Sequence, residues 1–323
     1  MLISKMALNA FRHSLEKLIF LFLFLAIGMA KAQFDVSFSH YWALQQYYNP
    51  ASVGRESKLS INGAYNMSMV GFNNNPKTMY IGANMPFYTM KTFHGVGLSF
   101  LNDQIGLFKN QNFALQYSAS FKMFTGRFRI GAQIGIITEA FDGSKLDLED
   151  SGDLAFQSSQ INGNKVDLGV GVYYMHPDWY AGLSAMHVNA PVVGLGEFNE
   201  IKIDRYYYFL GGYNIRLRNP FFRIKPSVIL RTDLVAYKAD ITGRLEYNND
   251  EKKMEFGASY SPGTSFTLLV GGDLHGMSLG YSYEVYTGGI SFVNGSHELT
   301  IGYQMDMNFT KRGRNKHKSV RLL

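Results

Sequence analysis

Residues 299–309, LTIGYQMDMNF, decide the fold, because their side chains alternate between two kinds at every step. The odd positions carry large apolar groups: Leu299, Ile301, Tyr303, Met305, Met307 and Phe309. The even positions carry small or polar groups: Thr300, Gly302, Gln304, Asp306 and Asn308. Successive side chains of a β-strand point to opposite faces, so this segment is predicted to be a strand with one apolar and one polar face.

The same alternation recurs along the chain and predicts about fourteen strands. They lie near 57–70, 77–86, 94–102, 112–124, 127–139, 165–175, 178–188, 203–215, 221–231, 238–247, 252–260, 264–272, 276–286 and 297–309. After every second strand the connection is tight, as at Thr125-Gly126 and His176-Pro177, whereas the alternate connections include 140–164 and 189–202. A soluble sandwich has no reason to sort its loops in this way. A bacterial membrane barrel does, with short periplasmic turns and long external loops.

The first 32 residues have the organisation of an export signal. A positively charged region precedes the apolar run 18–27, and Ala30-Lys31-Ala32 matches a small-x-small cleavage site, so the mature chain is expected to begin at Gln33. An N-terminal membrane anchor is the alternative. The apolar run is, however, shorter than the roughly 20 residues that span a bilayer.

After Gln33 the sequence contains no apolar run long enough for a transmembrane helix. A membrane protein without such helices must be a closed barrel, because every backbone group in lipid needs an internal partner. The predicted fold is therefore all-β, a transmembrane antiparallel up-and-down β-barrel in the outer membrane, with both termini in the periplasm. The expected regions are a signal peptide (1–32), an N-terminal segment (33–56), the barrel (57–309) and a basic tail (310–323).

The N-terminal segment 33–56 differs from the strands that follow it. It is rich in aromatic and amide side chains, it contains the turn signal Asn49-Pro50, and its pattern is too irregular for a confident strand. Three interpretations remain open. The segment lines or plugs the lumen, it sits against a partner at the periplasmic mouth, or it is an ordered lead-in that packs on the base of the barrel.

The tail, 310–323, concentrates positive charge at the end of the chain. The predicted partner-binding residues are Lys311, Arg312, Arg314, Lys316, Lys318, Arg321 and Leu322. Because the signal and the tail hold the excess positive charge of the whole chain, the part between them is net negative. The basic balance therefore does not indicate nucleic-acid binding. A periplasmic tail of this kind can meet acidic protein surfaces or membrane lipids, or it can remain solvated.

The sequence offers no convincing catalytic or metal site. The pattern Gly276-Met277-Ser278-Leu279-Gly280 fits G-x-S-x-G, but it lies inside an alternating strand and not on a strand-to-helix turn. Carboxylates at Asp147, Glu149 and Asp153 suggest a calcium loop, yet Ser158 stands where the distal Glu is needed. The chain contains no Cys. We expect neither an enzyme nor a cofactor.

Short motifs follow one another in a defined order. The aromatic stretch Phe38-Ser39-His40-Tyr41 leads to Asn49, Pro50, Ala51 and the nearby Gly54. The later motifs lie at 143–146, 167–171, 179–184, 280–284 and 296–303. In their order and spacing they resemble the PorP/SprF family of outer-membrane proteins, which belongs to the type IX secretion machinery of Bacteroidetes.

The resemblance implies a noncatalytic component of type IX secretion that couples the outer membrane to the periplasmic secretion ring. The implied partners are PorK-like and PorN-like ring proteins, with secreted cargo as a further one. The basic tail is similar to that of the PorP-like subtype. Two alternatives stay open: a passive porin or hydrophobic-solute channel, and an SprF-like anchor for a secreted surface adhesin.

Overall fold

The computed structural model describes residues 35–72, 74–143, 160–196, 199–249, 252–288 and 294–306. The expected signal peptide, the calcium-like loop at 147–158 and the tail at 310–323 lie outside these residues. Within the described part, no helix is long and apolar enough to cross a membrane.

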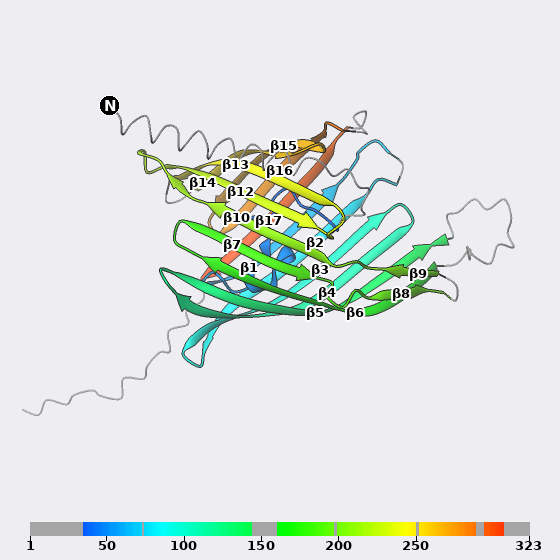
Figure 1. Cartoon of the computed structure of the whole chain (residues 1–323). Coiled ribbons are helices and arrows are strands. Elements are labelled where there is room, and N and C mark those ends of the chain that lie inside the picture. The colour runs from blue at the N-terminus through cyan, green and yellow to red at the C-terminus, as the bar shows by residue number, and fades with distance from the viewer. Residues whose placement is uncertain are drawn as a thin grey trace, which may run out of the picture.

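The chain forms a closed antiparallel barrel of fourteen strands, which confirms the predicted fold (Figure 1). The wall consists of β1 (Lys58–Met67), β2 (Lys77–Thr89), β3 (Thr92–Ile105), β4 (Phe108–Met123), β5 (Gly126–Asp142), β6 (Gln160–Met175), β7 (Trp179–Met186), β10 (Tyr206–Tyr213) with its short continuation β11 (Ile215–Arg216), β12 (Phe222–Thr232), β13 (Tyr237–Asn249), β14 (Lys252–Ser261), β15 (Ser265–Leu274), β16 (Met277–Tyr286) and β17 (Ser296–Asp306). Strands that follow one another in the chain are neighbours in the wall. Pairing of β1 with β17 closes the ring.

The structure departs from the expected strands mainly beside the long connections. β4, β5 and β6 begin or end several residues beyond the predicted bounds. A separate hairpin, β8 (Val192–Leu195) with β9 (Asn199–Lys202), occupies the connection between β7 and β10. These strands are too short to produce a clear alternating pattern, which explains why the sequence did not predict them.

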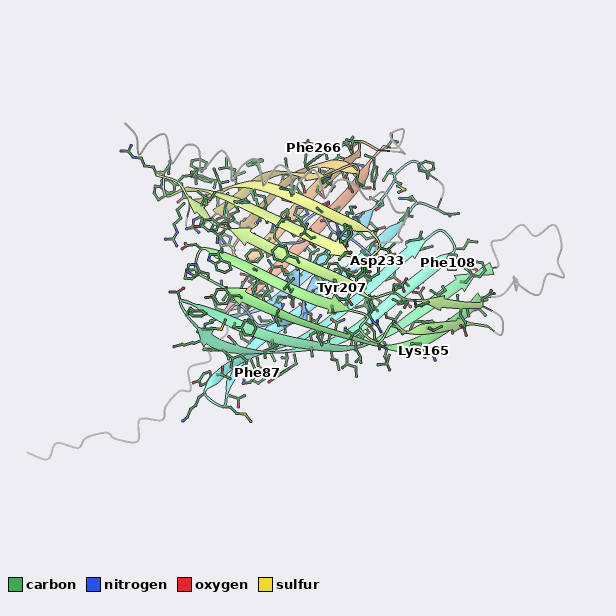
Figure 2. All side chains as sticks on the ribbon, in the orientation of Figure 1. Phe87, Phe108, Lys165, Tyr207, Asp233 and Phe266 are labelled. Atoms are coloured by element: carbon green, nitrogen blue, oxygen red, sulfur yellow. The ribbon has the colours of Figure 1, made fainter. Side chains whose placement is uncertain are left out.

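Alternation gives the barrel an apolar outer face and a polar inner face. Figure 2 draws these side chains on the ribbon. On β17, Leu299 is 55% exposed and Ile301 is 50% exposed, whereas Thr300 between them is buried against the lumen. Tyr303 and Met305 continue the outer row, as predicted, and Met307 lies outside the described residues. Large apolar side chains on the outside and polar ones within are the arrangement of a barrel that faces lipid.

The two ends of the barrel differ in their connections. At the short-turn end, the strands are joined by tight links such as 90–91, 124–125 and 275–276. At the long-loop end, the connections include 143–159 and 187–205. β1 begins and β17 ends at the short-turn end, where Lys58 lies opposite Asp306.

The register yields a direct test of the lipid-facing row. Arg in place of Ile301, at the middle of β17, should lower the free energy of unfolding by roughly 2–4 kcal/mol, because the charge meets the bilayer midplane. Arg in place of Met305, close to the short-turn end of the same row, should cost about 0–1 kcal/mol. Urea unfolding of barrels refolded into phospholipid vesicles measures both values. Equal costs at the two positions would contradict the proposed membrane placement.

Candidate functional site

The segment 35–56 lies inside the barrel and is called the plug. It includes a single helical turn, α2 (Gln45–Tyr48), followed by a 3-10 turn, η1 (Pro50–Ser52). Many of its side chains are almost fully buried; Phe38, Leu44 and Val53 are at most 1% exposed. Of the interpretations that the sequence left open, the structure therefore supports a segment that fills the lumen.

Asn49 fixes the turn in the middle of the plug. Its side-chain oxygen accepts a hydrogen bond of 2.9 Å from the backbone N–H of Ala51, which caps η1. Its side-chain nitrogen donates to the backbone oxygens of Val172 on β6 and Leu183 on β7, at 3.0 and 3.2 Å. Pro50 suits the first position of the turn because it has no N–H that would need a partner. Asn49 thus ties the plug to the wall while it shapes the plug.

Glycines in the wall allow the plug to lie directly against the strands. A side chain at Gly131 on β5 would overlap the backbone of Ala51, and one at Gly171 on β6 would overlap the Asn49 amide. Gly54 has a φ of +64°, a conformation that favours glycine, and it packs against the backbone of Gly95 on β3. The small residues on the lumenal face of the wall therefore lie where the plug passes close to the strands.

Arg129 on β5 holds the last turn of the plug. It is 1% exposed, and its Nε donates to the backbone oxygen of Ala51 at 3.0 Å. Its Nη2 donates to the backbone oxygen of Val53 and, at 2.6 Å, to the Ser118 hydroxyl. A buried guanidinium needs several acceptors, and the carbonyls of the plug supply them. Removal of the plug would leave this charge without those acceptors.

Amide side chains link α2 to β3, β4 and β5. Gln46 donates to the backbone oxygen of Leu98 at 2.9 Å and to the side chain of Gln116 on β4 at 2.8 Å. Gln116 donates back to the Gln46 backbone oxygen at 3.1 Å and onward to Gln133 on β5 at 3.0 Å. This chain of amides runs from the plug along the neighbouring strands β3, β4 and β5, and it satisfies polar groups of both the plug and the wall.

A carboxylate on β17 anchors the first part of the plug. Glu298 accepts hydrogen bonds from the backbone N–H groups of Ser39 and His40, at 2.7 and 2.9 Å, and lies 2.7 Å from the His40 ring nitrogen Nδ1. Nearby, the Tyr41 hydroxyl contacts Ser227 and Thr242 at 2.9 and 3.0 Å. The plug is therefore attached to strands on both sides of the barrel.

Asp35, the first described residue, lies toward the long-loop end. Its carboxylate accepts hydrogen bonds from Tyr208 at 2.7 Å and Tyr47 at 3.0 Å, and it lies 3.7 Å from His187, which follows β7. His187 also contacts Asp167 at 2.8 Å. The plug therefore runs from the long-loop end at Asp35 to the short-turn end at Glu56, where Glu56 accepts a bond from Gln304. Asp35 and Asp306, the first and last described residues, therefore lie at opposite ends of the barrel.

The cluster around His187 is held in its charged form. Burial alone would lower the pKa of His187, but the hydrogen bonds and charges of Asp167 and Asp35 raise it to about 10. Burial alone would raise the pKa of Asp35, yet His187, Tyr208 and Tyr47 hold it below its ordinary value. An imidazolium and a carboxylate therefore face each other at neutral pH, and they fix the start of the plug.

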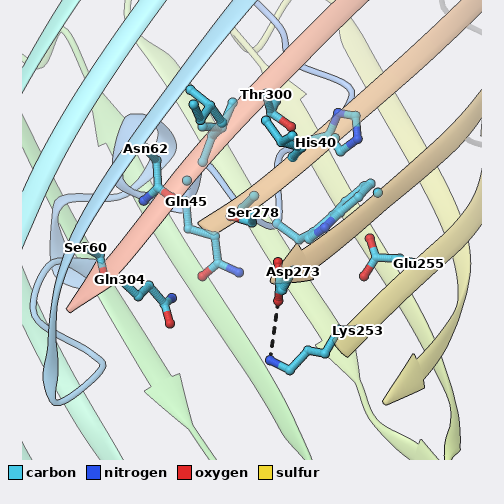
Figure 3. A pocket seen from close by; sticks show the side chains of 18 of the residues that line it. His40, Gln45, Ser60, Asn62, Lys253, Glu255, Asp273, Ser278, Thr300 and Gln304 are labelled. Carbon is cyan, nitrogen blue, oxygen red and sulfur yellow. Dashed lines mark ion pairs between the residues drawn. The ribbon is translucent and has the colours of Figure 1, made fainter. Parts of the chain in front are cut away.

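The plug leaves part of the lumen open. A cavity of about 280 Å³ lies between the plug and the strands β1 and β12–β17, close to their ends at the short turns (Figure 3). Its charged side chains are paired: Lys253 with Asp273 at 3.4 Å, and Arg244 with Glu255 at 3.1 Å. Arg244 also lies over the ring of Trp42, 4.0 Å from its centroid. The cavity is polar and has balanced charge.

The structure places some of the candidate residues named from the sequence, whereas others lie outside the described residues. Asn49, Pro50, Ala51 and Gly54 lie together where the plug meets β3, β5, β6 and β7. The basic residues of the predicted tail site, 311–322, lie outside the described residues. Ser278 of the G-x-S-x-G pattern lies within β16 and lines the cavity, without a helix after it. Among the described residues, no group of three potential ligands could hold a metal ion.

The sequence analysis missed the wall residues that bind the plug, above all Arg129 and Glu298. The available signal was a charged residue on the lumenal face of a strand. Arg129 alternates with Phe128 and Ile130, and Glu298 precedes the apolar Leu299. Such a charge indicates a lumenal partner, but it does not identify which part of the chain supplies it.

The fit between plug and wall is testable at a glycine. Ala in place of Gly131 should lower the free energy of unfolding by roughly 1–3 kcal/mol, since the new methyl group forces the plug away from β5. Ala in place of Gly243 on β13 meets no atom within 4 Å and should be nearly neutral. Fluorescence of Trp42, in a chain with Trp179→Phe, reports plug release during denaturation. An unchanged Trp42 transition in Gly131→Ala would contradict the proposed contact.

Comparison with solved structures finds outer-membrane barrels at low sequence identity. The CymD monoaromatic hydrocarbon channel has 11% identity and a TM-score of 0.49, and the match covers 88% of this chain and 97% of that one. A FadL homologue from Pseudomonas aeruginosa has 10% identity and a TM-score of 0.46, with 78% and 90% covered. Omp33 from Acinetobacter baumannii has 8% identity and a TM-score of 0.46, with 77% and 98% covered. No curated protein sequence matches the chain.

The sequence matches one protein family over most of its length. The family model described as type IX secretion system membrane protein PorP/SprF aligns with residues 30–303. This range includes the plug with its Asn49-Pro50-Ala51 motif and nearly the whole barrel. The chain therefore belongs to the PorP/SprF family of type IX secretion system membrane proteins.

Proposed function

We propose that this chain is a noncatalytic outer-membrane component of type IX secretion that couples the membrane to the periplasmic secretion ring. The observation that carries the proposal is the plug, because a lumen filled by the chain itself suits a structural component better than a conduit. Hydrogen bonds from Asn49, Gln46 and Arg129 hold the plug against several strands. Family membership supports a role in secretion and is neutral about the partner.

The proposed orientation places the short-turn end in the periplasm. Bacterial barrels have their short turns on that side, and β17 ends there at Asp306. The basic tail would then leave the barrel in the periplasm, where Lys311, Arg314 and Lys318 meet PorK-like or PorN-like ring proteins. A cationic tail of this kind is the reason for proposing the PorP-like subtype.

A passive channel is the second candidate, and the cavity of about 280 Å³ is the observation in its favour. Aromatic plug residues such as Phe38, Tyr41 and Tyr48 are at most 1% exposed and separate this cavity from the long-loop end. A third candidate is an SprF-like anchor for a surface adhesin. It differs from the coupling role in the exported protein that the barrel would hold. Neither alternative needs a tail that contacts the ring.

Bilayer recording separates a plugged barrel from a channel. The full mature chain should give no large steady conductance, because the plug fills the lumen. Deletion of residues 34–50 should produce an open current, since it removes the attachments made by Tyr41, Gln46 and Asn49. A large current from the full chain that is unchanged by the deletion would favour the channel.

Truncation after Thr310 tests the coupling role. The shortened chain should remain a heat-modifiable barrel in the outer membrane, because β17 (Ser296–Asp306) lies before the truncation and still pairs with β1 and β16. It should lose secretion or association with the ring. A full-length control removes the charge of the tail without changing its length; it carries Gln at Lys311, Arg312, Arg314, Lys316, Lys318 and Arg321. This control should show the same loss if charge drives docking. Normal secretion by the truncated chain would leave the tail as a solvated appendage.

A further inference from the structure

Four neighbouring strands extend past β1 at the short-turn end. β2 pairs with β1 only as far as Asn84, so residues 85–89 pair with β3 alone. The ends of β2, β3, β4 and β5 therefore form a projection, named the lip, which consists of residues 85–95 and 118–130. Phe87 marks the β2–β3 hairpin of the lip in Figure 2. Its two hairpins lie side by side because β3 pairs with β4.

The inner face of the lip carries aromatic and cationic side chains. Tyr88 and Phe93 are in ring contact at 5.0 Å, and the Arg127 guanidinium lies 4.8 Å from the centre of the Phe93 ring. Lys122 pairs with Arg127 across β4 and β5. By strand alternation these residues share the rows that carry the lumenal Ser118 and Arg129, so they face the barrel axis and not the lipid.

The tips of the two hairpins expose large apolar side chains. Met90 is 89% exposed and Phe124 is 91% exposed. Both have positive φ, 46° and 52°, in turns where Asn or Gly is the favoured residue. The chain therefore places apolar groups in water and in an unfavourable backbone conformation at the same time. Neither feature helps the barrel to fold, which indicates that the tips meet something outside it.

The lip is uniformly positive. Residues 85–95 and 118–130 contain no Asp or Glu. Lys91, Lys122 and Arg127 form no ion pair with any other residue that the structure describes. Cations on the opposite side of the same mouth differ, because Lys225 and Lys253 are paired with carboxylates. Among the described residues, the lip thus combines unpaired cations with a complete lack of acidic side chains.

We propose that the lip is a docking surface for a folded periplasmic protein whose contact face is acidic and offers apolar recesses to Met90 and Phe124. Carboxylates of the partner meet Lys91, Lys122 and Arg127, and the two apolar tips bury on contact. Phospholipid is the less suitable partner, because the cations point toward the barrel mouth. The inference rests on the proposed coupling function and adds a second contact, independent of the tail.

Photocrosslinking in cells tests the identity of the occupant. A photoreactive residue at position 90 or 124 of the full chain should crosslink to a protein, whereas one at Leu234 should give no such adduct. Leu234 is the matched control because it is also apolar, 65% exposed and at positive φ, but it lies at the long-loop end. Adducts with phospholipid alone at positions 90 and 124 would overturn the proposal.

Substitutions then test the chemistry of the contact with the crosslinked protein in purified form. Asn at both Met90 and Phe124 favours the observed turns, so a loss of binding cannot be attributed to misfolding. Gln at Lys91, Lys122 and Arg127 together should weaken association about tenfold and flatten its dependence on salt. Leu234→Asn should bind as the unmodified chain does. Unchanged affinity in both lip variants would overturn the proposal.

The lip proposal and the proposed coupling role can be tested separately. If the lip variants lose the partner while the chain truncated after Thr310 still secretes normally, docking at the lip stands and coupling through the tail fails. If they keep the partner while the chain truncated after Thr310 no longer secretes, the lip proposal fails and the coupling role stands. Secretion and affinity measured on the same set of variants therefore test the two ideas independently.

Discussion

The lumen of a fourteen-stranded barrel must be filled or remain wet, and this constraint governs the rest of the structure. Side chains from the wall suffice to fill a barrel of about eight strands, but they leave a wider one open. Here the chain fills much of the space with its own residues 35–56. A plug of irregular backbone in turn needs partners for its N–H and C=O groups, because buried polar groups without hydrogen bonds are costly. Arg129, Glu298 and Gln116 supply those partners from three different strands.

The polar inner face therefore has a more specific role than the solvation of a pore. Gly131 and Gly171 are small because the plug backbone passes directly over them. Arg129 is buried because plug carbonyls accept its hydrogen bonds. Opposite these contacts, the wall around the remaining cavity carries charges that pair with one another, such as Lys253 with Asp273. Plug and wall share these contacts, so a mutation on the lumenal face of a strand acts on the plug as well.

The sequence predicted the wall well because strand alternation is a local property. Leu299, Ile301, Tyr303 and Met305 face outward as the pattern requires, and the strand count agrees with the closed ring. The course of the plug depends on contacts between residues far apart in the chain, such as His40 with Glu298, and no local pattern contains that information. The motif Asn49-Pro50-Ala51 indicated a turn, but the sequence did not reveal that β6 and β7 accept its hydrogen bonds. The β8–β9 hairpin was missed for a different reason, since each of its strands is only four residues long.

The carboxylates that hold the plug and the cations of the lip differ in what they contact. Toward the long-loop end, the carboxylates of Asp35, Asp167 and Glu298 gather around the start of the plug and meet histidines. At the short-turn end, Lys91 and Lys122 have no carboxylate beside them. Carboxylates that bind the plug stabilise the chain itself, whereas unpaired cations repel one another and contribute nothing to its folding. A charge that the fold does not need is best explained by a contact with another molecule, and its position beside two exposed apolar turns favours a protein surface that is both acidic and recessed.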